Sequence, residues 1–174
     1  IPRCSFAIWA ERDHPTSPAL ARREDVAQIG RAPRYLPVYR IVGDNGELKT
    51  LILPVYGYGL WSTMYGFLAL EGDLRTVLGL RFYQRAETPG LGGAIDNPRW
   101  RAQWEGKVLF DDEWRVRVEL VRGSIDGSAP EARHQVDALA GATITSRGEE
   151  NLLNFWLSDK GYGPYLSRLR HERN

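Results

Sequence analysis

The sequence predicts an α+β fold, a largely antiparallel twisted sheet with flanking helices in a single domain. Two apolar segments, residues 38–42 and 48–55, flank Asp44-Asn45-Gly46, a strong signal for a β-hairpin. Helical patterns follow the strands without a regular alternation of strand and helix, and this order favours α+β over a parallel sheet. The length of 174 residues and the 43% hydrophobic content suit one globular domain with its own core.

Residues 1–36 are rich in proline and arginine, and we expect them to form a linker or a segment that wraps the domain, which itself spans residues 37–174. Within the first segment, residues 19–29 are expected to form one helix, with Ser17 as its cap and Pro18 at its first position. The chain does not begin with methionine, and no run approaches the ~20 apolar residues of a membrane span. We therefore expect an upstream membrane anchor that this chain lacks.

After the hairpin, strands are predicted for residues 60–70, 76–83 and 114–120, the last from its alternation of apolar and charged side chains. Residues 88–93 are Thr-Pro-Gly-Leu-Gly-Gly and predict a tight loop with unusual backbone angles. Asn97 and Pro98 predict the cap and the first position of a short helix, which places Trp100 and Trp104 on one face.

A further helix is predicted to begin near Arg147. Ser146 and Glu149 have the spacing of a capping box, directly ahead of apolar side chains at helical spacing, Leu152, Leu153 and Trp156. The end of the chain, residues 166–174, is basic and polar, so we expect it to be a solvated tail rather than a binding arm.

The loop before this helix, residues 140–145, leads into a helix N-terminus. Free backbone N–H groups and the positive end of the helix dipole make such a position favourable for a phosphate. Gly141 and Ala142 lack bulk, so the backbone could approach a ligand closely, and Thr143 adds a hydroxyl beside it. The same residues also fit a plain turn, and the local pattern leaves both interpretations open.

Composition and spacing exclude several classes of function. The formal net charge of +1 gives no electrostatic basis for nucleic acid as a partner. Cys4 is the only cysteine, so no internal disulfide or cysteine-rich metal site can form, and the three histidines do not have the spacing of metal ligands. No G-x-G-x-x-G follows a strand, no P-loop is present and no catalytic triad is recognisable, so direct binding of NADH is not expected.

Three stretches, in this order along the chain, carry a resemblance: Gly57-Tyr-Gly-Leu-Trp-Ser-Thr-Met-Tyr-Gly66, Glu87-Thr-Pro-Gly-Leu-Gly-Gly93 and Asp137-Ala-Leu-Ala-Gly-Ala-Thr143. Together they resemble the C subunits of sodium-translocating NADH:quinone reductases, within the FMN-binding domain family that also contains the G subunit of the Rnf electron-transport complex. The resemblance covers roughly residues 38–165. The Trp-Ser-x-Met-Tyr-Gly stretch and Asn97-Pro-x-Trp100 favour the quinone-reductase member over the Rnf member.

The resemblance implies that FMN is attached covalently, as a phosphoester, to Thr143, the last residue of the motif. The motif recognised by the flavin transferase comprises Asp137, Ala140, Gly141, Ala142 and Thr143. In the family this magnesium-dependent transferase takes the flavin from FAD. The family usually has serine or threonine where this chain has Ala140, so a hydroxyl that could contact the transferase or the phosphate is missing, while the acceptor itself is intact.

The resemblance also implies the cofactor-binding residues, which are Glu87, Thr88, Leu91, Gly92, Trp61, Ser62, Gly141, Ala142 and Thr145. Glu87, Thr88 and Leu91 are expected near the isoalloxazine ring, with backbone N–H groups of the glycine-rich loop facing its N5 and O4 edge. Taken alone, that loop also fits a plain tight connection. Trp61 fits either core packing or a flavin platform, and Ser62 fits either a bond to the phosphate or the end of a strand.

By resemblance, the chain is an electron carrier with covalent FMN in a membrane complex that oxidises NADH, reduces ubiquinone and pumps sodium. It would relay single electrons from an iron–sulfur centre to another flavin, and no complete activity is expected from this chain alone. Its partners would be the other membrane subunits and, during maturation, the transferase. The domain is expected on the periplasmic side of a bacterial inner membrane, anchored by an N-terminal helix. Alternatives are an Rnf-type FMN-binding subunit, or a flavin-binding or assembly module without a redox duty.

Overall fold

The computed structural model describes residues 3–7, 18–33, 35–84, 86–87, 92–123 and 125–172. The main sheet consists of β1 (Arg3–Ala7), β2 (Val38–Val42), β3 (Leu48–Tyr58), β4 (Thr63–Glu71) and β5 (Val77–Gln84), in that order and antiparallel throughout. A second sheet pairs β6 (Glu119–Val121) with β7 (Gln135–Asp137) in parallel. The helices are η1 (Gly92–Asp96), α1 (Pro98–Ala102), η2 (Pro130–His134), α2 (Thr143–Leu157) and α3 (Gly163–His171).

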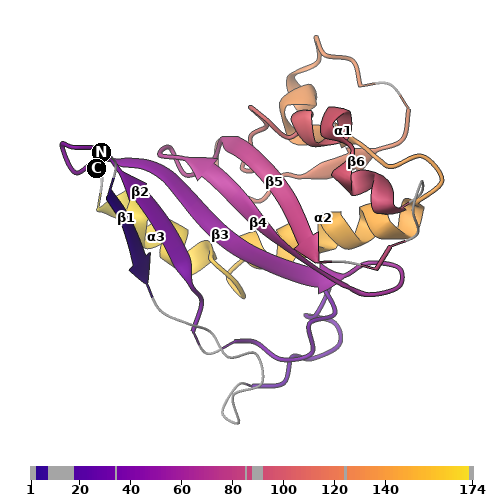
Figure 1. Cartoon of the computed structure of the whole chain (residues 1–174), viewed down its shortest axis with the longest axis horizontal. Coiled ribbons are helices and arrows are strands. Elements are labelled where there is room, and N and C mark those ends of the chain that lie inside the picture. Colours follow the sequence, from indigo (N-terminus) through magenta and orange to yellow (C-terminus); the bar gives the residue numbers. More distant parts are fainter. Residues whose placement is uncertain are drawn as a thin grey trace.

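The five-stranded sheet packs one face against the long helix. In Figure 1, α2 and α3 pass behind this sheet, and α1 and β6 lie beyond β5. Alternate residues of β3 are buried, with Leu51 and Leu53 both 0% exposed, and α2 contributes Leu152 and Trp156, also 0% exposed, to the same core. The predicted class, α+β with an antiparallel sheet and flanking helices, is confirmed.

The elements with local sequence signals lie where they were predicted. The hairpin joins β2 to β3, and Gly46 in its turn has a φ of +81°, a conformation that favours glycine. The apolar stretches at 60–70 and 76–83 become β4 and β5. Asn97 caps α1 by accepting a hydrogen bond from the N–H of Arg99 at 2.9 Å. These elements depend on contacts between residues close in sequence, which is why their patterns are recognisable.

The N-terminal segment differs from the expectation in two places. No strand was predicted within residues 1–36, but Arg3–Ala7 form β1 and pair with β2 along its free edge. The helix expected over residues 19–29 is absent, because these residues form turns in which Asp25 accepts hydrogen bonds from the N–H groups of Ile29 and Gly30, both at 2.7 Å. A side chain that satisfies these donors locally competes with the helix for them.

The long strand β3 extends beyond its pairing with β2, and side chains satisfy the backbone groups left over. Trp156 donates from its indole nitrogen to the carbonyl of Tyr56 at 2.6 Å, and the hydroxyl of Tyr162 donates to the carbonyl of Pro54 at 2.8 Å. Burial raises the pKa of Tyr162, so this hydroxyl keeps its proton. These bonds fix α2 and the start of α3 against the sheet, because an unpaired backbone group in the core would be costly.

The strand predicted over residues 114–120 is wrong for most of its length, since only its end lies in β6. Trp114 adopts a φ of +61°, and the carboxylate of Asp111 accepts hydrogen bonds from the N–H groups of Glu113 and Arg115 at 3.0 and 2.9 Å. This turn, centred on an aspartate, interrupts the ladder that the alternation of side chains suggested.

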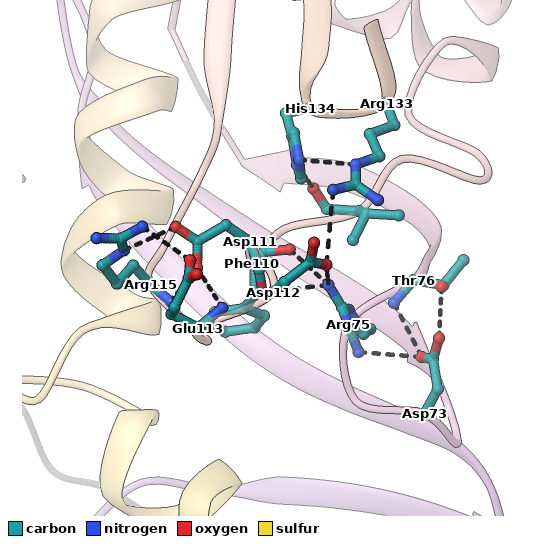
Figure 2. Close-up of polar contacts among 11 residues, drawn as sticks. Asp73, Arg75, Thr76, Phe110, Asp111, Asp112, Glu113, Arg115, Arg133 and His134 are labelled. Carbon is teal, nitrogen blue, oxygen red and sulfur yellow. Dashed lines mark hydrogen bonds and ion pairs between the residues drawn. The ribbon is translucent and has the colours of Figure 1, made fainter. Parts of the chain in front are cut away.

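Figure 2 shows how polar contacts fasten this turn to neighbouring segments. The guanidinium of Arg75 donates to the carbonyls of Phe110 and Asp111 at 2.9 and 3.2 Å. His134 is buried between two partners: its Nδ1 lies 2.6 Å from the carbonyl of Val108, and its Nε2 lies 3.0 Å from Nε of Arg133. Because Arg133 can only donate, Nδ1 carries the proton and Nε2 accepts. These contacts serve the packing of the loop.

The end of the chain is not the solvated tail that its composition suggested. Residues 163–171 form α3, in which Leu166 and Leu169 are 3% and 4% exposed. Two apolar residues at a spacing of i, i+3 are enough to bury one face of a short helix while its basic residues remain outside.

Candidate functional site

The strand β7 of the small parallel sheet is followed, after one turn, by the start of α2. Val121 of β6 pairs with Asp137 of β7, and the N–H of Ala138 donates to the carbonyl of Val121 at 2.8 Å. A turn follows, closed by the N–H of Ala142 on the carbonyl of Leu139 at 3.1 Å. Gly141 occupies the third position of this turn with a φ of +73°, where other residues would be strained.

The helix begins earlier than the capping-box interpretation placed it. Thr143 is its first residue and Ala142 its N-cap, so Ser146 and Glu149 lie inside the helix and do not cap it. The hydroxyl of Ser146 instead accepts a hydrogen bond from the N–H of Leu139 at 2.9 Å and holds the preceding turn against the helix. The spacing indicated a helix in this region correctly but misplaced its start.

The hydroxyl of Thr143 is accessible and lies beside a positive charge. Thr143 is exposed, as is the neighbouring Ile144, which is 57% exposed. Arg122, the residue that follows β6, donates a hydrogen bond from Nη2 to Oγ1 of Thr143. No side chain of the described residues caps the helix at Ala142, so Thr143 lies at the positive end of the helix dipole without a side-chain cap there.

Two turns of chain that are far apart in sequence meet at the carboxylate of Glu87. Glu87 is 4% exposed, and its Oε1 accepts hydrogen bonds from the N–H groups of Leu60 and Trp61, both at 3.1 Å. Its Oε2 accepts a bond of 2.6 Å from the hydroxyl of Thr145, which is 0% exposed. The segment at Glu87, the turn between β3 and β4 and the first turn of α2 are thereby joined through one side chain.

Glu149 lies one helical turn beyond Thr145 and is 0% exposed. Neither of its carboxyl oxygens has a hydrogen-bond partner among the described residues. Burial, and secondarily the charge of Glu87, raises the pKa of Glu149 well above its ordinary value. Burial without a partner therefore favours the neutral form of this second carboxyl group, since a buried charge without a partner is far more costly than a buried acid.

The residues expected around the flavin ring have different environments. Trp61 is 63% exposed, so the core-packing interpretation of this side chain is wrong. The hydroxyl of Ser62 accepts a hydrogen bond of 2.7 Å from the N–H of Ala86 and fastens the segment that carries Glu87. Gly92 begins η1, whereas Thr88 and Leu91 lie outside the described residues.

The start of the motif is held through the backbone groups of Asp137, which bind side chains at α1. Asp137 accepts a hydrogen bond at its carbonyl from the indole nitrogen of Trp100 at 2.8 Å, and its N–H donates to Oε1 of Gln103 at 3.0 Å. Ala140 is exposed in the turn, whereas Ala142 is 5% exposed and belongs to the core. Gly141 is therefore the small residue that a ligand could approach, and Ala142 is not.

Sequence reasoning missed three contributors to this region. Arg122 carries no local signal, because its proximity to Thr143 depends on the pairing of β6 with β7. Gln103 reaches Asp137 from the end of α1, and Glu149 was interpreted as a capping residue. Within the described part of the chain, no group of three or more potential metal-ligating side chains gathers, and no helix is long and apolar enough to span a membrane.

Comparison with known proteins identifies the family of this chain. Residues 59–158 match the FMN-binding domain family. The C subunits of the Na⁺-translocating NADH-quinone reductases of Pseudomonas aeruginosa and Yersinia pestis are 55% and 47% identical to this chain, over 94% and 92% of it and over 62% and 59% of their own lengths. The chain thus spans about six tenths of the length of these curated relatives.

Two crystal structures extend the comparison to the fold. NqrC from Shewanella oneidensis superposes with a TM-score of 0.83 at 34% identity, covering 91% of this chain and 71% of that one. The structure of the C subunit from Parabacteroides distasonis gives a TM-score of 0.63 at 30% identity, covering 76% of this chain and 63% of that one. The chain belongs to the FMN-binding domain family, and within it to the C subunits of the Na⁺-translocating NADH-quinone reductases.

Proposed function

We propose that this chain is the FMN-carrying domain of such a C subunit, with FMN joined through its phosphate to Thr143. The observation that carries the proposal is the hydroxyl of Thr143, exposed at the start of α2 and bound by Arg122. Membership of the FMN-binding domain family supplies the cofactor. The relatives named as reductase subunits supply the setting, an NADH-quinone reductase that translocates sodium.

The residues around Thr143 fit a phosphodiester. Such a group keeps one negative charge, and the site offers an arginine, the N-terminal end of a helix of 15 residues and the compact turn at Gly141. Each of these favours an anion, and the guanidinium can form charge-assisted hydrogen bonds with phosphate oxygens. Thr145, two residues away, is buried and bound to Glu87, so its hydroxyl is not accessible.

Attachment is a phosphoryl-type transfer from FAD, catalysed by a separate magnesium-dependent transferase. The hydroxyl oxygen of Thr143 forms a bond to the phosphorus of the FMN half, the bond from that phosphorus to AMP breaks, and the hydroxyl proton is released. The partner that the structure gives this hydroxyl is Arg122, which donates and cannot accept a proton, so in this proposal proton removal falls to the transferase. Ala140 is exposed beside it and offers no hydroxyl of its own.

The bound flavin supplies redox chemistry that the side chains of this domain lack, namely the exchange of single electrons. In this proposal Glu87 acts as a structural clamp: its buried carboxylate accepts hydrogen bonds from the backbone N–H groups of Leu60 and Trp61 and holds the turn between β3 and β4. Trp61, 63% exposed beside that clamp, would offer its ring as a platform for the flavin.

At the level of the complex, the domain would relay electrons from an iron–sulfur centre to another flavin. Oxidation of NADH, reduction of ubiquinone and transport of sodium would belong to the assembly with the other membrane subunits. The domain would lie on the periplasmic side of a bacterial inner membrane, anchored by an N-terminal helix. NADH itself would not bind here.

The proposal is tested by co-expressing the chain with a flavin transferase that modifies NqrC and measuring its intact mass after denaturation. The parent protein and Thr145→Ser should each carry one FMN and fluoresce as denatured bands on a gel, whereas Thr143→Ala should carry none. Flavin that is lost on denaturation, or that remains in Thr143→Ala, would contradict the assignment. A redox titration of the attached flavin then separates an electron carrier from a module without a redox duty.

A further inference from the structure

Arg122 is the described side chain that donates a hydrogen bond to the hydroxyl of Thr143. We propose that Arg122 is a positioning residue of the attachment site: it orients the acceptor hydroxyl before transfer and forms an ion pair with the phosphodiester afterwards. This inference rests on the proposed attachment at Thr143 and adds a residue outside the motif of residues 137–143. It assigns to one arginine the recognition of an anionic phosphate at this surface.

Arg122 directly follows an element that is paired with the segment leading to Thr143. It directly follows β6, whose last residue, Val121, pairs with Asp137, and Asp137 opens the segment that ends at Thr143. The strand β6 also contacts α2, and the backbone of Leu120 lowers the pKa of Glu150 against the larger effect of burial. The arginine therefore directly follows a strand that contacts the helix begun by Thr143.

Arg147 is the second cation near this surface, four residues from Thr143 and thus on the same side of α2. Burial raises the pKa of Glu150, and the charge of Arg147 lowers it slightly, but the hydrogen bond to the hydroxyl of Thr143 comes from Arg122. Arg122 forms no ion pair at 4.0 Å or less with a carboxylate of the described residues. A phosphate added at Thr143 would therefore meet a guanidinium that no carboxylate there already neutralises.

The chemistry of the two states explains why an arginine suits this position. Before transfer, the guanidinium donates to a neutral hydroxyl and leaves donors free for the phosphate of the incoming FAD. After transfer, two of its N–H groups can face two phosphate oxygens, a bidentate arrangement that a lysine cannot reproduce. The interaction is thus stronger with the product than with the unmodified protein.

The test compares Arg122→Gln and Arg122→Lys with a matched control, Arg117→Gln, and with Arg147→Gln. Arg117 lies on the same segment and is also exposed, but it pairs with Glu119 at 3.5 Å. The initial rate of FMN incorporation is measured with the transferase and FAD, and ³¹P NMR is recorded on the fully modified proteins. Thermal unfolding of the unmodified variants reports on folding.

Arg122→Gln should incorporate FMN about tenfold more slowly, the factor expected for one lost hydrogen bond to a charged group, and should shift the ³¹P resonance. Arg122→Lys should recover part of the rate, and the deficit should shrink as salt is added. Arg117→Gln should match the parent in both readouts, and Arg147→Gln should show the smaller effect of the two site arginines. A purely structural role of Arg122 would not move the phosphorus resonance of the modified protein.

Rates and ³¹P spectra of Arg122→Gln and Arg122→Lys equal to those of the parent would overturn the inference while leaving Thr143 as the attachment site. No FMN on the parent, or FMN retained in Thr143→Ala, would instead contradict the proposed function. If Arg122→Gln unfolds below the assay temperature, Arg122→Lys provides the test, because lysine keeps the positive charge but lacks the two parallel N–H donors of the guanidinium. An unchanged ³¹P resonance in Arg122→Lys would reject the bidentate pair.

Discussion

Thr143 and Thr145 lie two positions apart in the first turn of α2, and the structure gives their hydroxyls opposite environments. Thr145 is 0% exposed and donates to the carboxylate of Glu87 at 2.6 Å. Thr143 is exposed and accepts a hydrogen bond from Arg122. The hydroxyl of Thr145 is therefore buried and hydrogen-bonded, whereas the hydroxyl of Thr143 is accessible at the surface. Residue type gives no basis for choosing between them as the acceptor of a flavin, whereas burial does.

The phase of the helix decides which threonine is buried. Residues 145, 149, 152 and 156 follow one another at helical spacing on the buried side of α2, and residues 143, 144 and 147 are exposed. That phase is set where the helix meets the β3–β4 turn, at Gly148 and at the hydrogen bond from Thr145 to Glu87. Substitutions at these contacts therefore test the comparison, from the largest expected effect to the smallest.

Gly148→Ala is expected to have the largest effect on stability. A Cβ at this position would lie 2.7 Å from the carbonyl oxygen of Tyr58, and a backbone atom cannot move aside as a flexible side chain can. We expect a loss of about 1–3 kcal/mol in urea unfolding, the range for an overpacked core, although alanine normally favours a helix over glycine. Gly79→Ala is the control, because nothing lies within 4 Å of its added Cβ. A variant as stable as the parent would show that α2 is not held this closely.

Thr145→Val keeps the shape of the side chain but removes the donor to Glu87. A buried carboxylate oxygen would then lose its partner, and we expect a loss of about 1–3 kcal/mol in the free energy of unfolding. Thr145→Ser keeps the hydroxyl and should lose less. Equal losses in the two variants, measured by urea unfolding at pH 7, would mean that packing of the methyl group rather than the hydrogen bond matters here.

Glu149→Gln tests the neutral acid on the buried side of the helix. The pKa of Glu149 is raised in the folded protein, so its contribution is fully present below the ordinary value of 4.5 and is lost as the pH rises through the folded-state pKa. Glutamine cannot ionise, so the variant should exceed the parent in stability by about 1 kcal/mol or more at pH 8 and by less at pH 5.

The control for this experiment is Glu131→Gln, an exposed glutamate in η2. It makes the same substitution at an exposed position, so an effect that depends on burial should be absent. Parallel pH profiles for Glu149→Gln and the parent would show that Glu149 is ionised in the folded state, which its burial argues against.

Thr143→Val should have the smallest effect on stability. The side chain is exposed, and its hydrogen bond to Arg122 is a surface contact, so we expect a change within about 0.5 kcal/mol. The variant nevertheless removes the proposed acceptor. A loss in thermal unfolding as large as that of Thr145→Val would place Thr143 among the structural residues and weaken the distinction between the two positions.

The parts of this fold that could be predicted from sequence are those with a local cause. The turn at Gly46 and the cap at Asn97 each depend on residues a few positions apart. β1 could not be predicted in this way, because it forms on an edge supplied by β2. The helix expected over residues 19–29 failed because Asp25 satisfies backbone donors that a helix would use.

The candidate site shows the same division. The segment that ends at Thr143 could be recognised from residues 137–143. The predicted start of α2 was wrong, because the hydroxyl of Ser146 accepts a hydrogen bond from the N–H of Leu139 and does not cap the helix. Two contacts organise the site across long separations, Glu87 with Thr145 and Arg122 with Thr143. Each depends on the pairing of strands or the docking of a helix, and no local spacing encodes either one.

The central claim, that burial selects Thr143 over Thr145, is tested most directly by locating the flavin within one peptide. Trypsin cleaves after Arg133 and Arg147, so both threonines fall in the same fragment, residues 134–147. Fragmentation of this peptide from protein modified by the transferase should place the mass of FMN on Thr143 and leave Thr145 unmodified. FMN on Thr145, or on a residue outside this peptide, would contradict the account.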